Sequence, residues 1–166
     1  MKTYPDIPFS VTSIILRKFG RMFRLDEDPD AHFFPRHLSD DQLQEFISPH
    51  FRISEVVHSV TAQSRGLDND LSFQDLCAAT LLARDVLEPI RVFLDRPIYV
   101  SSWFRSKFVN AAVGGVANSR HLYACAADIP CAGFERCNLR TFFETLKLSV
   151  PTFKAIFYPT FVHVQI

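Results

Sequence analysis

Two histidines and one aspartate have the residue types and spacing of a catalytic zinc site. His121 and Asp128 lie seven residues apart around a stretch of small residues, and His163 lies three residues before the end of the sequence. A catalytic zinc ion takes three protein ligands and keeps a fourth position for water. Two imidazoles and one carboxylate leave it a positive charge, which lowers the pKa of water and polarises a peptide carbonyl. Spacing alone predicts this only weakly, because most histidines are not ligands.

The other metal-binding side chains do not form a second candidate site. We predict that four histidines are not ligands: His32, His37, His50 and His58. Pro35 lies between the first two and prevents their pairing on one helix. The four cysteines include no C-x-x-C pair, so a cysteine-based structural zinc site is not expected. We interpret them as buried or free thiols, with a Cys131–Cys137 disulfide as the alternative.

The strands that would position these ligands come late in the sequence. Residues 126–129 form a short apolar stretch, which predicts a strand carrying Asp128. Residues 155–158 and 161–165 predict two further strands, with His163 on the second. Because helical patterns come first and short strands later, we expect an α+β fold, a small antiparallel sheet with flanking helices, rather than a βαβ array.

Helical patterns fill most of the rest of the chain. The most regular one begins at Ser72, which has the pattern of an N-cap with Asp75 as its capping-box partner. Pro89 should kink this helix or end it early. Shorter helices are predicted over residues 39–46, 54–60, 106–113 and 138–147, and a buried strand over residues 98–102.

Residues 1–40 differ from the rest, and we interpret them as an N-terminal extension before a domain over residues 41–166. Apolar and basic residues of this extension could share one helix: Val11, Ile14, Ile15, Phe19, Met22 and Phe23, with Arg17, Lys18, Arg21 and Arg24. A basic amphipathic helix can touch an anionic membrane surface, but it more often packs on its own domain. We therefore favour packing over membrane contact.

Charge and hydropathy limit the kinds of partner and compartment. The chain has 18 basic and 18 acidic residues, so its net charge is near zero and no nucleic-acid partner is expected. No apolar run reaches the roughly 18 residues of a transmembrane helix. The apolar run 11–16 is too short for the core of a signal peptide. We expect a chain made in the cytoplasm, with export by another route left open.

Further motifs accompany the three candidate ligands. The pattern S-x-H-x-x-G-x-A-x-D is matched by Ser119, His121, Ala126 and Asp128, with His163 on a terminal strand. Upstream, the patterns S-S-G-Y-R-S and N-x-x-V-G-G are matched in part by residues 101–106 and by Asn110, Val113, Gly114 and Gly115. Together these motifs resemble the zinc D-Ala-D-Ala peptidase family. Residues 48–51 and 86–91 also resemble its cell-wall carboxypeptidase branch, and the resemblance covers roughly residues 45–166.

This resemblance implies a fold, a metal ion and roles for single residues. The family includes D,D-carboxypeptidases, D-Ala-D-Ala dipeptidases and phage endolysins, and it shares its fold with the Hedgehog signalling domain. His121, Asp128 and His163 would be the ligands of one zinc ion per chain. Arg105 would donate hydrogen bonds to the scissile carbonyl, with a salt bridge that holds the strand end as the alternative. Ser119 would either orient the substrate or cap the ligand loop.

The sequence departs from the family pattern at three positions. Ala124 replaces the motif glycine, which is tolerable unless this residue needs a positive φ. Trp103 replaces another glycine and would lie near the site, where it could narrow the cleft or stack on a substrate. Thr160 replaces the Glu or Asp that acts as general base, and a hydroxyl cannot accept a proton usefully near neutral pH. Glu135 and Glu144 are candidates to supply that base.

The resemblance, together with these residues, implies a zinc-dependent peptidase that hydrolyses stem or cross-link peptides of peptidoglycan through a metal-activated water. Arg105 would be catalytic, and Ser119 and Trp103 would bind substrate. The cleft loops would decide between a D,D-carboxypeptidase and an endolysin-type endopeptidase, and the sequence leaves this open. Thr160 supports the alternative, a non-catalytic zinc-bearing domain that binds cell-wall peptide or a protein partner. The place of action would be a bacterial cell wall, for a bacterial or a phage protein.

Overall fold

The computed structural model describes residues 37–166 of the chain. The predicted N-terminal helix, and with it the question of membrane contact, lies outside the described residues. So does His32. Within the described part, no helix is long and apolar enough to cross a membrane.

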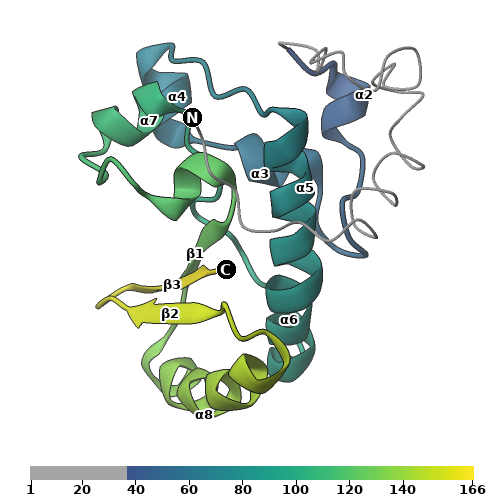
Figure 1. The fold of residues 1–166 in the computed structure, drawn as a ribbon, viewed down its shortest axis with the longest axis vertical. Coiled ribbons are helices and arrows are strands. Elements are labelled where there is room, and N and C mark those ends of the chain that lie inside the picture. The colour runs from purple at the N-terminus through teal and green to yellow at the C-terminus, as the bar shows by residue number, and fades with distance from the viewer. Residues whose placement is uncertain (1–36) are drawn as a thin grey trace.

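Three short antiparallel strands form the sheet, in the order β1-β3-β2 (Figure 1). They are β1 (Ala126–Pro130), β2 (Lys154–Phe157) and β3 (Phe161–Gln165). The central strand β3 pairs with β1 in a register that places Asp128 opposite His163. The sheet therefore brings two of the candidate ligands side by side, although they lie far apart in the sequence.

Seven α-helices accompany this sheet in the described residues. They are α2 (Asp40–Leu43), α3 (Ile53–Val57), α4 (Val60–Arg65), α5 (Phe73–Leu82), α6 (Glu88–Leu94), α7 (Lys107–Ala112) and α8 (Gly133–Ser149). Figure 1 shows α5 and α6 stacked end to end along one side of the molecule. Helix α8 lies at one end of this column, and α3, α4 and α7 lie at the other. The prediction of an α+β fold with a small antiparallel sheet and flanking helices is confirmed.

The column of α5 and α6 is interrupted where the sequence predicted a break. Ser72 caps α5, accepting a hydrogen bond from the main-chain N–H of Asp75, whose carboxylate accepts one from Ser72 in return. A π-helical turn, Ala83–Leu87, then joins α5 to α6, and Pro89 lies in the first turn of α6. A proline lacks the N–H that would continue the α-helical ladder, and its ring clashes with the carbonyl four residues earlier, so a regular α-helix is disfavoured just before it.

One predicted element is wrong. Residues 98–102 do not form a buried strand; the segment makes one isolated bridge, between Ser102 and Asp128. The main-chain N–H of Ser101 also donates to the carbonyl of Asp128 at 2.9 Å. Tyr99 is 63% exposed while Val100 is buried, so only part of this apolar segment packs against the core. This segment is nevertheless important, because it borders β1 at the position of Asp128.

The core lies between the helical column and the sheet. Its largest fully buried side chains include Trp103, Phe51, Leu76, Leu87 and Phe153. All four cysteines are free thiols, as expected, and Cys77 is buried deeply enough that the pKa of its thiol rises to about 12. A thiol with such a pKa stays protonated and behaves as a small apolar side chain.

Candidate metal centre

The three predicted ligands converge at one place. Asp128 comes from β1, His163 from β3, and His121 from the 3₁₀ turn Arg120–Tyr123 that precedes β1. One potential ligand atom from each residue lies within 4.8 Å of those of the other two. A single zinc ion holds its nitrogen and oxygen ligands at about 2 Å, so donor atoms at such separations can share one ion.

Hydrogen bonds fix which atom of His121 can bind a metal. Its Nδ1 lies 2.6 Å from the main-chain carbonyl oxygen of Trp103, which can only accept, so Nδ1 carries the hydrogen. Its Nε2 lies 3.3 Å from Oδ1 of Asp128 and is left with a free lone pair. A histidine ligand whose other nitrogen donates to a carbonyl is the usual arrangement at protein metal sites.

The second histidine approaches the same oxygen. Nδ1 of His163 lies 2.8 Å from Oδ1 of Asp128, and its Nε2 lies 3.1 Å from Oε1 of Gln165. The rings of His121 and His163 meet edge to face, with centroids 5.0 Å apart. Oδ1 of Asp128 is thus the atom around which both imidazoles gather.

The protonation states of the cluster suit a cation. Burial raises the pKa of the Asp128 carboxyl, but the imidazoles of His121 and His163 beside Oδ1 and the nearby charge of Arg105 outweigh it, so the pKa lies well below its usual range. Burial lowers the pKa of His121, and the opposing effect of the Asp128 carboxylate beside it does not reverse this. The site therefore offers an ionised carboxylate and a neutral imidazole near pH 7, which are the forms that bind zinc.

Arg105 holds the other side of the aspartate. Its Nη2 donates to Oδ2 of Asp128 at 2.7 Å, and its Nε donates to the hydroxyl of Ser102 at 2.8 Å. The side chain is 19% exposed and lines the same cleft as the three ligands. The salt bridge that sequence reasoning held as an alternative thus exists, and it is made to a candidate ligand.

These residues line an open cleft of about 610 Å³. Its walls also include Asn118, Ser119, Arg120, Lys154, Ile156, Tyr158 and Phe161. Ser119 precedes the 3₁₀ turn, and its side chain makes no capping hydrogen bond there. The cleft is therefore wide enough for a peptide and places a serine hydroxyl, apolar surface and several cations beside the ligand cluster.

Comparison with known proteins identifies the family. A sequence model of Peptidase M15 matches residues 49–165, which include the candidate ligands and Arg105. The chain belongs to the M15 peptidases. A 45-residue stretch is also 47% identical to a protein of Streptomyces albus G named zinc D-Ala-D-Ala carboxypeptidase. That match spans 27% of this chain and 18% of the relative.

This M15 chain departs from the expectation for Trp103. The indole is fully buried, packs edge to face against Phe51 at 5.8 Å, and donates its N–H to the carbonyl of Ala124 at 3.1 Å. A side chain with no exposed surface cannot stack on a substrate, so the prediction of a substrate contact is corrected. Trp103 instead supplies the carbonyl that orients His121 and holds the loop on which that ligand lies.

The candidates for the general base lie outside the cleft. Glu135 is buried at the start of α8, where its carboxylate accepts from the main-chain N–H of Ala132 and pairs with Arg96. Glu144 lies on the exposed side of α8, where it pairs with Lys147. Asp128 is the only carboxylate among the described residues that line the cleft. The structure therefore brings neither glutamate to the metal cluster.

The replaced motif positions have different consequences. Ala124 ends the 3₁₀ turn with a φ of +55°, the backbone conformation for which the family glycine is suited. Thr160 is exposed in the turn between β2 and β3 and does not line the cleft, although its neighbours Tyr158 and Phe161 do.

Gln165 was not identified as part of the site from the sequence. The two-residue period of a strand places its side chain on the same face as His163.

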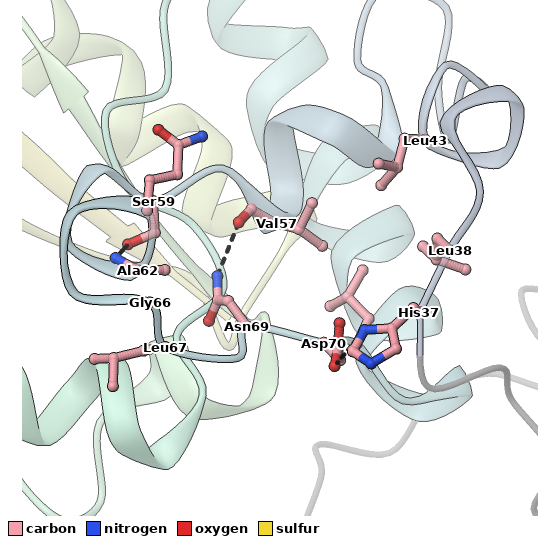
Figure 2. Close-up of a pocket in the computed structure, with 12 residues that line it drawn as sticks. His37, Leu38, Leu43, Val57, Ser59, Ala62, Gly66, Leu67, Asn69 and Asp70 are labelled. Carbon is pink, nitrogen blue, oxygen red and sulfur yellow. Dashed lines mark hydrogen bonds and ion pairs between the residues drawn. The ribbon is translucent and has the colours of Figure 1, made fainter.

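A second hollow, of about 400 Å³, offers no comparable chemistry (Figure 2). Its walls are largely apolar and include Leu38, Leu43 and Leu67. His37 and Asp70 meet at its edge at 3.3 Å, and no third ligand joins them among the described residues. His37, His50 and His58 all lie outside the metal cluster.

Proposed function

We propose that the chain is a zinc-dependent peptidase that hydrolyses stem or cross-link peptides of peptidoglycan. The observation that supports it is the convergence of His121, Asp128 and His163 in an open cleft of an M15 peptidase. The similarity to the zinc D-Ala-D-Ala carboxypeptidase of Streptomyces albus G supports this substrate class. Both cleavage at a terminal D-Ala and cleavage within a cross-link fall under the proposal.

The residues around the cluster suit this reaction. A zinc ion bound there would activate a water molecule and polarise the scissile carbonyl as a Lewis acid. The guanidinium of Arg105 has five N–H bonds. One donates to Ser102 and one to Asp128, so the others remain to stabilise negative charge on the carbonyl oxygen. Ser119 offers a hydroxyl for a polar group of the peptide, and Val116 and Ile156 offer apolar surface.

One observation favours a second candidate function, a zinc-bearing domain that binds cell-wall peptide or a protein partner without cutting it. Peptide hydrolysis benefits from a general base that takes the proton of the attacking water. Among the described residues that line the cleft, the only carboxylate is Asp128, which is placed as a ligand. Binding would need the cleft and its cations but would not need this base.

Metal analysis tests the site itself. We expect one zinc per chain after purification, and loss of that zinc in the double variant His121→Ala/His163→Ala, because two of three ligands are removed. His37→Ala is the matched control, since His37 lies at the other hollow and should leave the zinc content unchanged. Full zinc content in the double variant would refute the assignment.

Peptide assays then separate the two functions. Purified peptidoglycan and a peptide that ends in D-Ala-D-Ala are incubated with the zinc-loaded chain, and products are identified by mass spectrometry. Release of D-Ala or of cross-link fragments supports the peptidase. Saturable binding of the same peptide without any product supports the binding domain. Neither binding nor cleavage would overturn the proposed substrate class.

A further inference from the structure

The two histidines of the cluster are oriented by acceptors of different kinds. His121 donates from Nδ1 to the main-chain carbonyl of Trp103, whereas Nε2 of His163 lies 3.1 Å from the side-chain oxygen of Gln165. The main-chain acceptor is provided by the fold and survives any side-chain change. The second acceptor depends on the side chain of one residue.

The position of Gln165 follows from β3. It lies two residues after His163, so both side chains project from the same face of the strand, and both line the cleft. Gln165 pairs with Ala126 of β1 on one side and with Lys154 of β2 on the other. A central position in the sheet holds its backbone, so its amide is kept next to the imidazole.

The imidazole of His163 needs that acceptor. Its Nδ1 lies on the side of the cluster, 2.8 Å from Oδ1 of Asp128, so Nδ1 is the nitrogen that faces a bound metal. When Nδ1 binds a metal, the one hydrogen of the neutral imidazole lies on Nε2. An acceptor at Nε2 stabilises this tautomer and fixes the plane of the ring.

We propose that Gln165 is a positioning residue of the metal centre, whose amide oxygen accepts the Nε2 hydrogen of His163 and holds Nδ1 toward the metal. The inference rests on the proposed function, because it requires a metal ion at the cluster. Gln165 acts through His163 and touches neither the metal nor the reacting atoms. Removing its acceptor weakens zinc binding by about 10- to 100-fold, the usual effect of losing such an outer partner.

The test compares two substitutions of Gln165 in the full chain. Gln165→Met keeps the length of the side chain but lacks an oxygen acceptor, and Gln165→Glu keeps an acceptor and removes the donor. Zinc affinity is measured by competition with a chelating dye. We expect an affinity about 10- to 100-fold weaker for Gln165→Met and at least wild-type affinity for Gln165→Glu. Gln63→Met is the matched control, because Gln63 is exposed at the other hollow.

A spectroscopic measurement distinguishes positioning from general destabilisation. In zinc-loaded protein with ¹⁵N-labelled histidine, the Nε2–H proton of His163 should be protected from exchange with water in the wild type and in Gln165→Glu. The signal should be lost in Gln165→Met. Wild-type affinity and a retained signal in Gln165→Met would overturn the inference and leave the proposed zinc site intact. Weak binding by Gln165→Glu would overturn it too, because the amide would then act as a donor. Failure of the wild type to bind zinc would overturn both.

Discussion

Nη2 of Arg105 donates a hydrogen bond at 2.7 Å to Oδ2 of Asp128, while Oδ1 of the same carboxylate lies within 3.3 Å of a nitrogen on each histidine. The two oxygens of one aspartate are thereby given separate partners. The arginine fixes the rotation of the carboxylate and directs Oδ1 toward the position of a metal. Arg105, which was expected to be catalytic, is thus also linked to a candidate metal ligand.

The first prediction concerns this arginine. Arg105→Lys should keep the fold and the zinc but lower kcat/KM on a D-Ala-D-Ala peptide by about 100-fold or more, because an ammonium lacks the planar fork of donors. The rate is measured in the wild-type chain and in the Thr160→Glu background. Arg84→Lys, which alters an exposed pair with Asp85, is the control. Equal turnover in Arg105→Lys and wild type would show that Arg105 is structural.

The residues of the metal cluster could be predicted from sequence because two of them are local and the third lies on a recognisable strand. His121 and Asp128 lie on one short turn and the strand that follows it, and His163 lies on a strand whose apolar pattern is clear. The pairing of Asp128 with His163 then requires only that β1 and β3 be neighbours. Residue types and spacing made these three residues candidates, and the resemblance to the zinc D-Ala-D-Ala peptidases assigned them as ligands.

Positions that depend on long-range packing were not predicted correctly. An aromatic residue next to a functional motif can face either the cleft or the core. Trp103 faces the core, where it packs against Phe51, and the sequence does not show this contact. Glu135 lies only seven residues after Asp128, but the start of α8 directs its carboxylate to its own helix and to Arg96. The number of residues between two positions limits how far apart they can lie, but it does not determine where their side chains point.

The second prediction concerns Glu88. Its side chain connects the two segments, residues 48–51 and 86–91, that also resemble the carboxypeptidase branch of the family. Oε1 of Glu88 accepts from the Ser48 hydroxyl at 2.7 Å and from the His50 main-chain N–H at 2.9 Å, and Oε2 lies 2.7 Å from Nδ1 of His50. Glu88→Gln weakens these charge-assisted bonds, so the free energy of unfolding at pH 7 should fall by about 1–3 kcal/mol. Denaturant unfolding measures it.

The same carboxylate predicts a pH dependence. Burial raises the pKa of Glu88, but its hydrogen bonds to His50 and Ser48 outweigh this, so the pKa lies below the ordinary value of 4.5. The unfolded chain then binds the proton more readily, and the stabilisation present above that value is lost as the pH falls through the folded pKa. The fall in stability below about pH 4.5 should be shallower in Glu88→Gln than in wild type. Glu144→Gln, at an exposed position, should not change the curve.

The third prediction concerns Ala124. An alanine at a φ of +55° costs about 1–2 kcal/mol relative to glycine, whereas its buried methyl group and the entropy of the unfolded chain favour alanine. Ala124→Gly should therefore be close to neutral or stabilising. Ala126→Gly, at a buried position of β1 with an ordinary φ, lacks the strain and should be less stable than Ala124→Gly by about 1–2 kcal/mol. Equal losses in thermal or denaturant unfolding would show that the positive φ carries no cost.

The last prediction concerns Thr160, where the M15 pattern breaks. We expect the zinc-loaded wild type to be slow on D-Ala-D-Ala peptides, because no carboxylate besides Asp128 lines the described cleft. Thr160→Glu should raise turnover, since general-base help contributes about 10² to 10⁴ in rate. The turn that carries Thr160 lies between Tyr158 and Phe161, both of which line the cleft, so a longer acidic side chain there can approach the cluster. Thr160→Gln has the same length without the base and is the matched control.

Two further variants complete this argument. Glu144→Gln should leave the rate unchanged, because Glu144 is exposed on α8 and pairs with Lys147. Glu135→Gln should lower stability through its lost contact with Arg96 but leave the rate per folded molecule unchanged. A fast wild type whose rate collapses in one of these variants would show that this glutamate is the base and that its side chain moves to the cleft. If zinc is bound and no variant turns over, Thr160→Glu included, the binding function is favoured, because an acid restored at the family position would then have no reaction to assist.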